Sequence, residues 1–317
     1  MIRKIGITTA ALLLLGAAVI VLSYTRFRSE RLDALVSGSL VADTAVGKIE
    51  YQLTGDSGSV LLFLHGTPGG YDQTTSMPGF RVLAPSRPGY LRTPLDVGLT
   101  PEDQARAYVA LLDALDIDEV VVMGASGGGP SSISFAAAYP ERTQGLIAME
   151  AVSQKIELGG DRELTPFFMK TDFLLWITLT LLDAFMGAEG VVGLLVPDPA
   201  IQLLILEDPE KTENMTGLLW SIWPISQRNL GQQNDVTQFA RLNLPSPAIT
   251  VPTLILHGTE DINVPYSQSQ QLVAQIPGAI LHTIEGADHM MPFSHSEEVE
   301  RAVEQFVIGL GIDRGEP

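Results

Sequence analysis

The sequence has no cysteine among its 317 residues, which excludes disulfide bonds, thiolate metal sites and cysteine nucleophiles. Basic residues are also scarce: 19 lysines and arginines stand against 37 acidic residues, so the formal net charge is −18. This charge argues against a nucleic-acid partner, whose phosphates the protein would repel, and against stable binding to anionic lipid headgroups. The five histidines are not clustered and no H-E-x-x-H or dinucleotide fingerprint is present, so we expect neither a metal nor another cofactor.

The first 25 residues differ in composition from the rest of the chain. Ile5–Leu22 is an uncharged apolar run with basic residues on both sides. A helix of this length extends roughly 27 Å, which is close to the hydrocarbon thickness of a bilayer. We therefore expect residues 1–25 to form a single-pass membrane anchor or uncleaved signal, followed by a polar stalk over residues 26–45.

Two other interpretations of this segment stay open. A buried helix is one, although a segment that is apolar on all sides and flanked by basic residues is rarely found in a soluble core. A cleaved signal peptide is the other, with Val21-Leu22-Ser23 as its cleavage site, but the apolar run is long for a signal peptide. The flanking positive charges nearly balance and orient the anchor weakly. We expect the folded domain to lie on the extracytoplasmic side of the membrane.

From about Lys48 the sequence alternates between strand-like and helix-like segments. Continuous apolar runs such as S-V-L-L-F-L-H, from Ser59, and E-V-V-V-M, from Glu119, are typical of parallel strands covered on both faces. T-P-E-D, from Thr100, is typical of a helix start, with a threonine N-cap and proline in the first turn. This order predicts an α/β fold with a mostly parallel sheet and helices on both faces.

The alternation stops in the middle of the chain and resumes near Val251. The intervening segment contains all three tryptophans and several apolar, helix-like runs. We therefore predict a core formed by residues 46–152 and 248–313, into which residues 153–247 are inserted as a helical cap. Some of the large apolar side chains of this cap are expected to face a cleft beneath it, where they would form an apolar pocket.

The stretch G-A-S-G-G-G-P directly follows the E-V-V-V-M strand and precedes a helix-like segment. Gly124-x-Ser126-x-Gly128 matches the nucleophile elbow, in which small neighbours allow a strained turn to present the serine hydroxyl. A phosphate-binding loop is the competing interpretation, but no Gly-Lys-Ser/Thr follows, and a dinucleotide loop would require G-x-G-x-x-G. Because G-x-S-x-G also occurs by chance, the prediction that Ser126 is a nucleophile depends on the strand before it and the helix after it.

A serine nucleophile needs a histidine to accept its proton and a carboxylate to orient that histidine. His289 lies just past one late strand and Asp261 just past another, so both are expected at the carboxyl edge of the sheet, as Ser126 is. The other four histidines lie within a strand, at H-G strand ends or near a helix start. Glu150 follows the strand after the serine helix and stays open as an alternative acid.

The tetrahedral intermediate of such a reaction also needs backbone N–H donors for its oxyanion. One donor is expected from Gly127, at the N-terminus of the helix that follows Ser126. The other is expected from Thr67 in the glycine-rich stretch H-G-T-P-G-G, because Pro68 has no N–H to donate.

From about Lys48 to Gly311 the chain resembles the α/β-hydrolase superfamily. The resemblance is carried, in order, by L-H-G-T-P-G-G, S-R-P-G-Y, G-A-S-G-G-G-P, H-G-T-E-D-I-N-V-P and G-A-D-H. It implies an eight-stranded sheet, a catalytic triad and an oxyanion hole, with the following roles: nucleophile Ser126, acid Asp261, base His289, oxyanion donors Thr67 and Gly127. One departure is Leu91-Arg92 after S-R-P-G-Y, where relatives often continue with glycine and serine; it leaves the subfamily open.

These observations predict a serine hydrolase that cleaves an ester, or less readily an amide, of a small apolar substrate through an acyl-enzyme. A carbon–carbon bond hydrolase or a proline-iminopeptidase-like aminopeptidase would use the same triad and stays open. A non-catalytic, membrane-anchored binding protein of the same fold is the alternative from another class. The sequence leaves the oligomeric state open.

Overall fold

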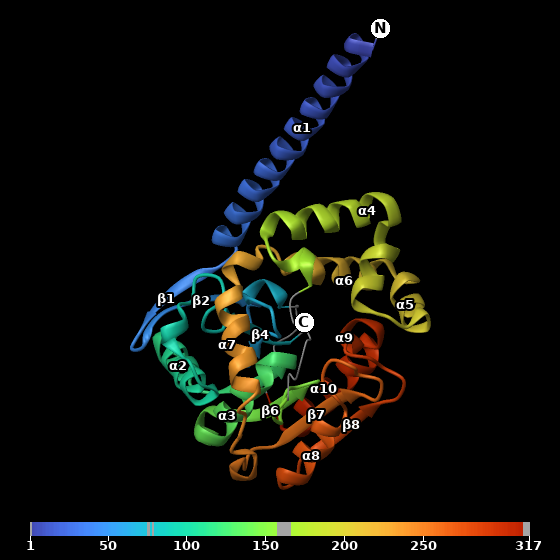
Figure 1. Cartoon of the computed structure of the whole chain (residues 1–317). Helices are drawn as coiled ribbons and strands as arrows, with labels where there is room; N and C mark the ends of the chain where they lie inside the picture. The colour runs from blue at the N-terminus through green and yellow to red at the C-terminus, as the bar shows by residue number, and fades with distance from the viewer. Residues whose placement is uncertain (1, 75–76, 78, 157–165, 313–317) are drawn as a thin grey trace. The chain divides into compact units, whose positions relative to one another are not determined.

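The computed structural model describes residues 2–74, 77, 79–156 and 166–312. Its contacts divide the chain into two compact units, Met1–Leu40 and Val41–Pro317. The strands form an eight-stranded sheet in the order β1-β2-β4-β3-β5-β6-β7-β8 (Figure 1). Their bounds are Leu40–Thr44 (β1), Gly47–Thr54 (β2), Val60–Leu64 (β3), Arg81–Pro85 (β4), Val120–Ala125 (β5), Thr143–Met149 (β6), Thr253–Gly258 (β7) and Ile280–Ile284 (β8). β2 is antiparallel to β4, and β3 to β8 run parallel to one another.

The helices connect these strands and form the central insertion. Their bounds are Ile2–Ser37 (α1), Pro101–Ala114 (α2), Gly129–Ala138 (α3), Asp172–Leu195 (α4), Pro199–Leu206 (α5), Pro209–Ser221 (α6), Asn229–Phe239 (α7), Ser267–Gln275 (α8), Met291–Ser294 (α9) and Ser296–Gly309 (α10). The predicted start of α2 is confirmed: Thr100 accepts a hydrogen bond from the Asp103 N–H, and the Asp103 side chain accepts one from the Thr100 N–H, which closes a capping box.

The continuous apolar runs of the central strands are explained by helices on both faces of the sheet. Successive strand residues point to opposite faces. Val122 of β5 belongs to a buried cluster that includes residues of α2, α3 and α8. Its neighbour Val121 belongs to a second cluster, which includes residues of α10. The sheet is thus covered on both sides, as the parallel α/β pattern predicts.

The N-terminal region differs from the expected polar stalk over residues 26–45. The helix α1 continues through these residues to Ser37, and β1 begins at Leu40, so the sheet starts earlier than the predicted core boundary at residue 46. Residues 26–37 contain no proline or glycine to end the helix, and Arg26 pairs with Glu30 one turn later at 2.8 Å. In the structure, residues 26–37 are therefore a largely exposed helix and not an irregular linker.

In the described part of the segment between β6 and β7, the helices α4 to α7 lie within residues 153–247, the predicted cap. α4, α5 and α6 contact one another (Figure 1). α7 comes after them in the chain and follows the short 3-10 turn Ile225–Gln227. α4 bends at Gly187, whose φ of +60° and ψ of −156° are not helical. In the described part of the chain, Ala11–Ser37 and Asp172–Leu195 are the two helices with the length and hydropathy of a membrane span. The second contains the apolar run F-L-L-W-I-T-L-T-L-L, Phe173–Leu182, and extends beyond it to Leu195.

Candidate active site

The candidate site residues all follow the carboxyl ends of strands, which meet at one edge of a parallel sheet. The strand before each residue is as follows: β3 before Thr67, β5 before Ser126, β6 before Glu150, β7 before Asp261 and β8 before His289. Residues far apart in the sequence are thereby brought to one edge.

Ser126 occupies a strained turn between β5 and α3. Its φ is +48°, a left-handed conformation that non-glycine residues adopt at a cost. The glycines around it are required by close contacts: a Cβ on Gly124 would overlap the Ser132 hydroxyl, and one on Gly128 would overlap the backbone oxygen of Leu64. The turn therefore needs the spacing Gly124-x-Ser126-x-Gly128, and Ser126 itself is half-buried.

The structure brings Ser126, His289 and Asp261 into one hydrogen-bonded chain. His289 Nε2 lies 3.0 Å from Ser126 Oγ, and His289 Nδ1 lies 2.6 Å from Asp261 Oδ2. Asp261 contacts the imidazole and not the serine, so it is placed to orient the ring. This geometry is what a serine nucleophile, a histidine base and an orienting acid require.

Asp261 is held as a carboxylate by its neighbours. Its Oδ1 accepts the backbone N–H groups of Asn263 and Val264 at 2.8 and 2.9 Å, and His257 Nε2 lies 3.2 Å from Oδ2. Burial acts to raise the pKa of Asp261, but the hydrogen bonds from His257 and His289, the charge of His289 and the Val264 N–H outweigh it and hold the pKa well below its usual range. The neighbours of Asp261 thus favour its ionised form beside His289.

Glu150, the alternative acid, is buried beside the site, and its protonation differs from that of Asp261. It has a φ of +35°, and among the described residues its Oε2 has no hydrogen-bond partner. Burial, and then the charge of Asp261, raise the pKa of Glu150 well above its usual range. Because His289 Nδ1 contacts Asp261, the geometry favours Asp261 over Glu150 as the orienting carboxylate.

The two expected oxyanion donors lie next to each other. A Cβ placed on Gly127 would stand 3.2 Å from the backbone nitrogen of Thr67 and would overlap the Thr67 hydroxyl. A Cβ placed on Gly66 would stand 3.3 Å from Ser126 Cβ. The loop after β3 therefore packs directly on the turn that carries Ser126, which is where an oxyanion would form on attack by this hydroxyl.

Sequence reasoning missed the side chains that hold this loop. His65 Nε2 accepts the backbone N–H of Arg87 at 2.9 Å, and the Arg87 Nη2 donates to the Gly66 oxygen at 3.2 Å. Burial and the nearby Arg87 lower the pKa of His65 well below its usual range, so its imidazole stays neutral. Arg87 pairs in turn with Asp235 of α7, a contact between core and cap. Only the S-R-P-G-Y motif signals Arg87 in the sequence, and nothing local signals Asp235.

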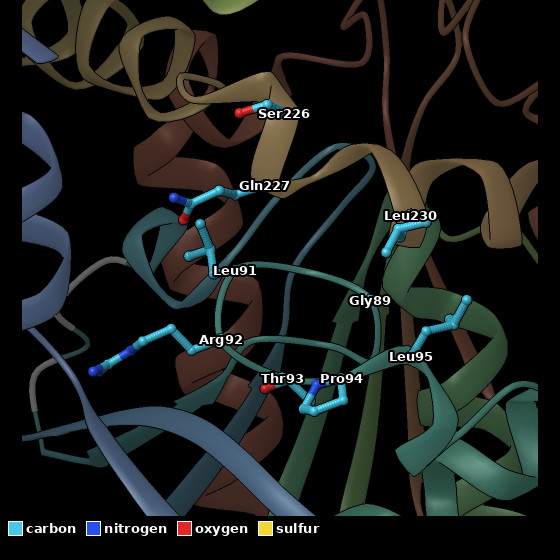
Figure 2. Close-up of a pocket in the computed structure, with 9 residues that line it drawn as sticks. All are labelled: Gly89, Leu91, Arg92, Thr93, Pro94, Leu95, Ser226, Gln227 and Leu230. Carbon is cyan, nitrogen blue, oxygen red and sulfur yellow. The ribbon is translucent and has the colours of Figure 1, made fainter.

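A cavity of about 210 Å³ lies at another seam between core and cap (Figure 2). It is lined by residues of the loop after β4, of the turn before α7 and of the start of α7: Gly89, Leu91, Arg92, Thr93, Pro94, Leu95, Ser226, Gln227 and Leu230. None of these described lining residues is a candidate site residue. Within the described ranges, no three His, Asp or Glu side chains come together in a way that would hold a metal ion.

Comparisons with known proteins identify the family of the chain. The profile of the alpha/beta hydrolase family matches residues 61–302. An uncharacterized hydrolase of Bacillus subtilis, YcgS, is 29% identical over 256 residues, which cover 77% of this chain and 89% of the relative. A 2-hydroxy-6-oxo-6-phenylhexa-2,4-dienoate hydrolase of Burkholderia cepacia is 27% identical over 246 residues, covering 72% of this chain and 77% of that protein.

Solved structures show the same similarity. An α/β-hydrolase fold protein from Nakamurella multipartita is 31% identical and superposes with a TM-score of 0.77, covering 84% of this chain and 98% of that one. The chain therefore belongs to the α/β-hydrolase family, and the fold expected from the sequence motifs is confirmed. In activity it is a hydrolase.

Proposed function

We propose that the protein is a serine hydrolase that cleaves an ester, and less readily an amide, of a small apolar substrate through an acyl-enzyme. The observation that carries the proposal is the relay of 3.0 Å from Ser126 Oγ to His289 Nε2 and 2.6 Å from His289 Nδ1 to Asp261. A hydroxyl becomes a useful nucleophile when a neutral imidazole accepts its proton during attack.

In the proposed mechanism, Ser126 Oγ attacks the ester carbonyl while His289 Nε2 takes its proton. Asp261 keeps Nδ1 protonated and stabilises the imidazolium that forms. The backbone N–H groups of Thr67 and Gly127 receive the oxyanion. His289 then returns the proton to the leaving alcohol, and a water molecule, activated by the same imidazole, releases the acid from Ser126.

The arginines near the site are already paired with carboxylates, and this pairing favours an uncharged substrate. Arg87 and Arg228 are both fully buried and reach the loop after β3, but Arg87 is paired with Asp235 and Arg228 with Asp72. Their charges are thus already balanced. The cap contributes large apolar side chains such as Trp176 and Leu179, which are buried in α4. Together these features support a substrate whose recognised part is apolar.

A second candidate is the hydrolysis of a carbon–carbon bond. It is supported by the name of the Burkholderia cepacia relative, whose substrate, a 2-hydroxy-6-oxo-dienoate, contains no ester or amide bond. Hydrolysis of such a compound must break a bond between the ketone carbon and its neighbour. The same relay of Ser126 and His289 would serve, but the substrate's carboxylate would need a cationic partner.

Turnover against two substrate sets separates these candidates. The first is a series of p-nitrophenyl esters with acyl chains of increasing length. The second is a set of 2-hydroxy-6-oxo-dienoates, whose turnover is monitored by the loss of their visible absorbance. We expect turnover of the esters that requires Ser126 and no turnover of the dienoates. Dienoate cleavage faster than ester cleavage would establish the second candidate. A prolyl amide with a free N-terminal proline tests the aminopeptidase alternative. If the folded protein turned over neither substrate set nor this amide, while still binding apolar ligands, a non-catalytic role would replace both candidates.

We also propose that α1 anchors the protein in a membrane, with the folded domain on the extracytoplasmic side. The proposal is supported by the apolar surface of α1: Leu13, Leu14 and Leu15 are 63 to 72% exposed. Replacement of Leu14 and Leu15 by lysine should move the protein from the membrane fraction to the soluble fraction, because each buried lysine is costly in a bilayer. The same substitutions should leave ester turnover unchanged. An unchanged distribution would contradict the anchor.

A further inference from the structure

Asp235 of the cap helix α7 reaches into the core, where it is only 3% exposed. Its Oδ1 accepts a hydrogen bond from Arg87 Nη1 at 3.0 Å, and its Oδ2 accepts from Arg87 Nη2 and from the Tyr90 hydroxyl, each at 2.5 Å. The Thr67 hydroxyl also donates to Oδ2. A buried carboxylate requires a paired charge and hydrogen bonds, and this set supplies both. The cap is thereby tied to the loop after β3.

The same contacts give the Thr67 side chain a single orientation. Its hydroxyl donates to Asp235 and accepts from Arg87 Nη2 at 3.0 Å. The backbone of Thr67 lies beside Gly127, the other proposed oxyanion donor. Arg87 Nη2 also donates to the Gly66 oxygen, so these contacts restrain the backbone of the loop, and their loss would let the Thr67 N–H shift relative to that of Gly127.

The docking of α7 on the core does not depend on Asp235 alone. The Leu91 N–H donates to the Gln227 oxygen at 2.8 Å, and the Gly231 N–H donates to the Gly89 oxygen at 2.9 Å. Arg228 forms a bidentate pair with Asp72 as well. We expect these contacts to hold α7 against the core when the Asp235 charge is removed. A loss of activity in such a variant would therefore not require the cap to separate from the core.

We propose that Asp235 is a positioning residue of the oxyanion hole: through the Thr67 hydroxyl and Arg87 it holds the Thr67 N–H where the oxyanion develops. This inference rests on the function proposed above. It assigns to a residue of the cap a role in stabilising the transition state. It also gives a role to the S-R-P-G-Y motif, which supplies both Arg87 and Tyr90.

Two variants test the role, and a third serves as a control. Asp235→Asn keeps the shape of the side chain but removes its charge. Thr67→Val removes only the hydroxyl, leaving the pair of Arg87 and Asp235 and the Thr67 N–H in place. Glu50→Gln is the matched control, because Glu50 is likewise a buried carboxylate paired with an arginine, Arg92 at 2.6 Å, and it accepts from Ser86.

We expect Asp235→Asn and Thr67→Val each to lower kcat for an ester by about 10²-fold, the effect of a small misplacement of a reacting group, while KM stays near the wild-type value. The affinity for an aryl trifluoromethyl ketone, which forms an oxyanion adduct with the serine, should fall by the same factor. Glu50→Gln should lower Tm by an amount similar to Asp235→Asn and keep kcat and the ketone affinity. A merely structural role for Asp235 would predict equal kcat values for these two variants.

The positioning role is overturned if folded Thr67→Val keeps the wild-type kcat and ketone affinity while wild-type protein turns over the ester. A wild-type protein that neither turns over esters nor reacts with a phosphonate at Ser126 would overturn the proposed function and this inference together. The two failures are therefore distinguished within one set of assays.

Discussion

His289 Nε2 lies 3.0 Å from the hydroxyl oxygen of Ser126, although 163 positions separate the two residues in the sequence. The same ring is held at Nδ1 by Asp261, so the tautomer with a proton on Nδ1 leaves Nε2 as the acceptor for the serine proton. The assignment of roles at this site follows from which atom of the imidazole faces which neighbour.

Asp261→Asn tests whether the carboxylate sets that tautomer. The amide would keep the shape of the side chain and favour the other tautomer of His289, so we expect kcat for an ester to fall by about 10⁴-fold with little change in KM. Steady-state kinetics provide the measurement, and Glu150→Gln is the matched comparison because Glu150 is another buried acid at this edge and the alternative candidate for the role. A larger loss in Glu150→Gln than in Asp261→Asn would transfer the role of acid to Glu150.

Gly127→Ala tests the oxyanion hole. The added methyl group would overlap the Thr67 hydroxyl and stand 3.2 Å from the Thr67 backbone nitrogen, so the two donors would have to separate. We expect kcat to fall by about 10²–10³-fold, the usual effect of losing one oxyanion donor. Gly217→Ala in α6 is the control, because a methyl group there meets nothing within 4 Å. Equal kcat in the two variants would remove Gly127 from the hole.

Glu150 should make the protein less stable as the pH rises. Its pKa in the folded protein lies well above the ordinary value of 4.5, so above that pH the unfolded chain releases the proton while the folded chain retains it. The free energy of unfolding should therefore fall by up to about 1.4 kcal/mol per pH unit between 4.5 and the folded-state pKa. Below pH 4.5 both states are protonated and the contribution is fully present.

Glu150→Gln should remove this dependence. Urea unfolding of wild type and variant at pH 4 and pH 8 provides the comparison: we expect similar stabilities at pH 4 and a more stable variant at pH 8. A wild-type protein that gained stability relative to the variant between these pH values would show that the Glu150 carboxylate is charged and paired in the folded protein.

The core and the relay could be predicted from the sequence because each part has a local signature. Ser126 follows a continuous apolar strand inside a glycine-rich turn, and His289 and Asp261 follow strands of the same kind. In a parallel sheet these strand ends meet at one edge, so position along the chain was enough to bring the residues together.

The parts that escaped prediction depend on tertiary contacts. Asp235 lies in N-D-V-T, an unremarkable stretch of a cap helix, and its importance arises only from the way α7 packs on Arg87 and Tyr90. The continuation of α1 to Ser37 and the strand β1 were missed for a different reason: polar residues 26–37 are compatible with either a linker or an exposed helix. Composition does not distinguish those two.

The most direct test of the account is reaction of the purified protein with a fluorophosphonate, followed by mass spectrometry of its peptides. A fluorophosphonate reacts rapidly with a serine whose proton is taken by a neighbouring base and only slowly with an ordinary serine. We predict one modified residue, Ser126, in the wild-type protein and no modification in Ser126→Ala. Labelling of the alanine variant to the same extent, or an unlabelled Ser126 in folded wild-type protein, would contradict the claim that Ser126 is the nucleophile.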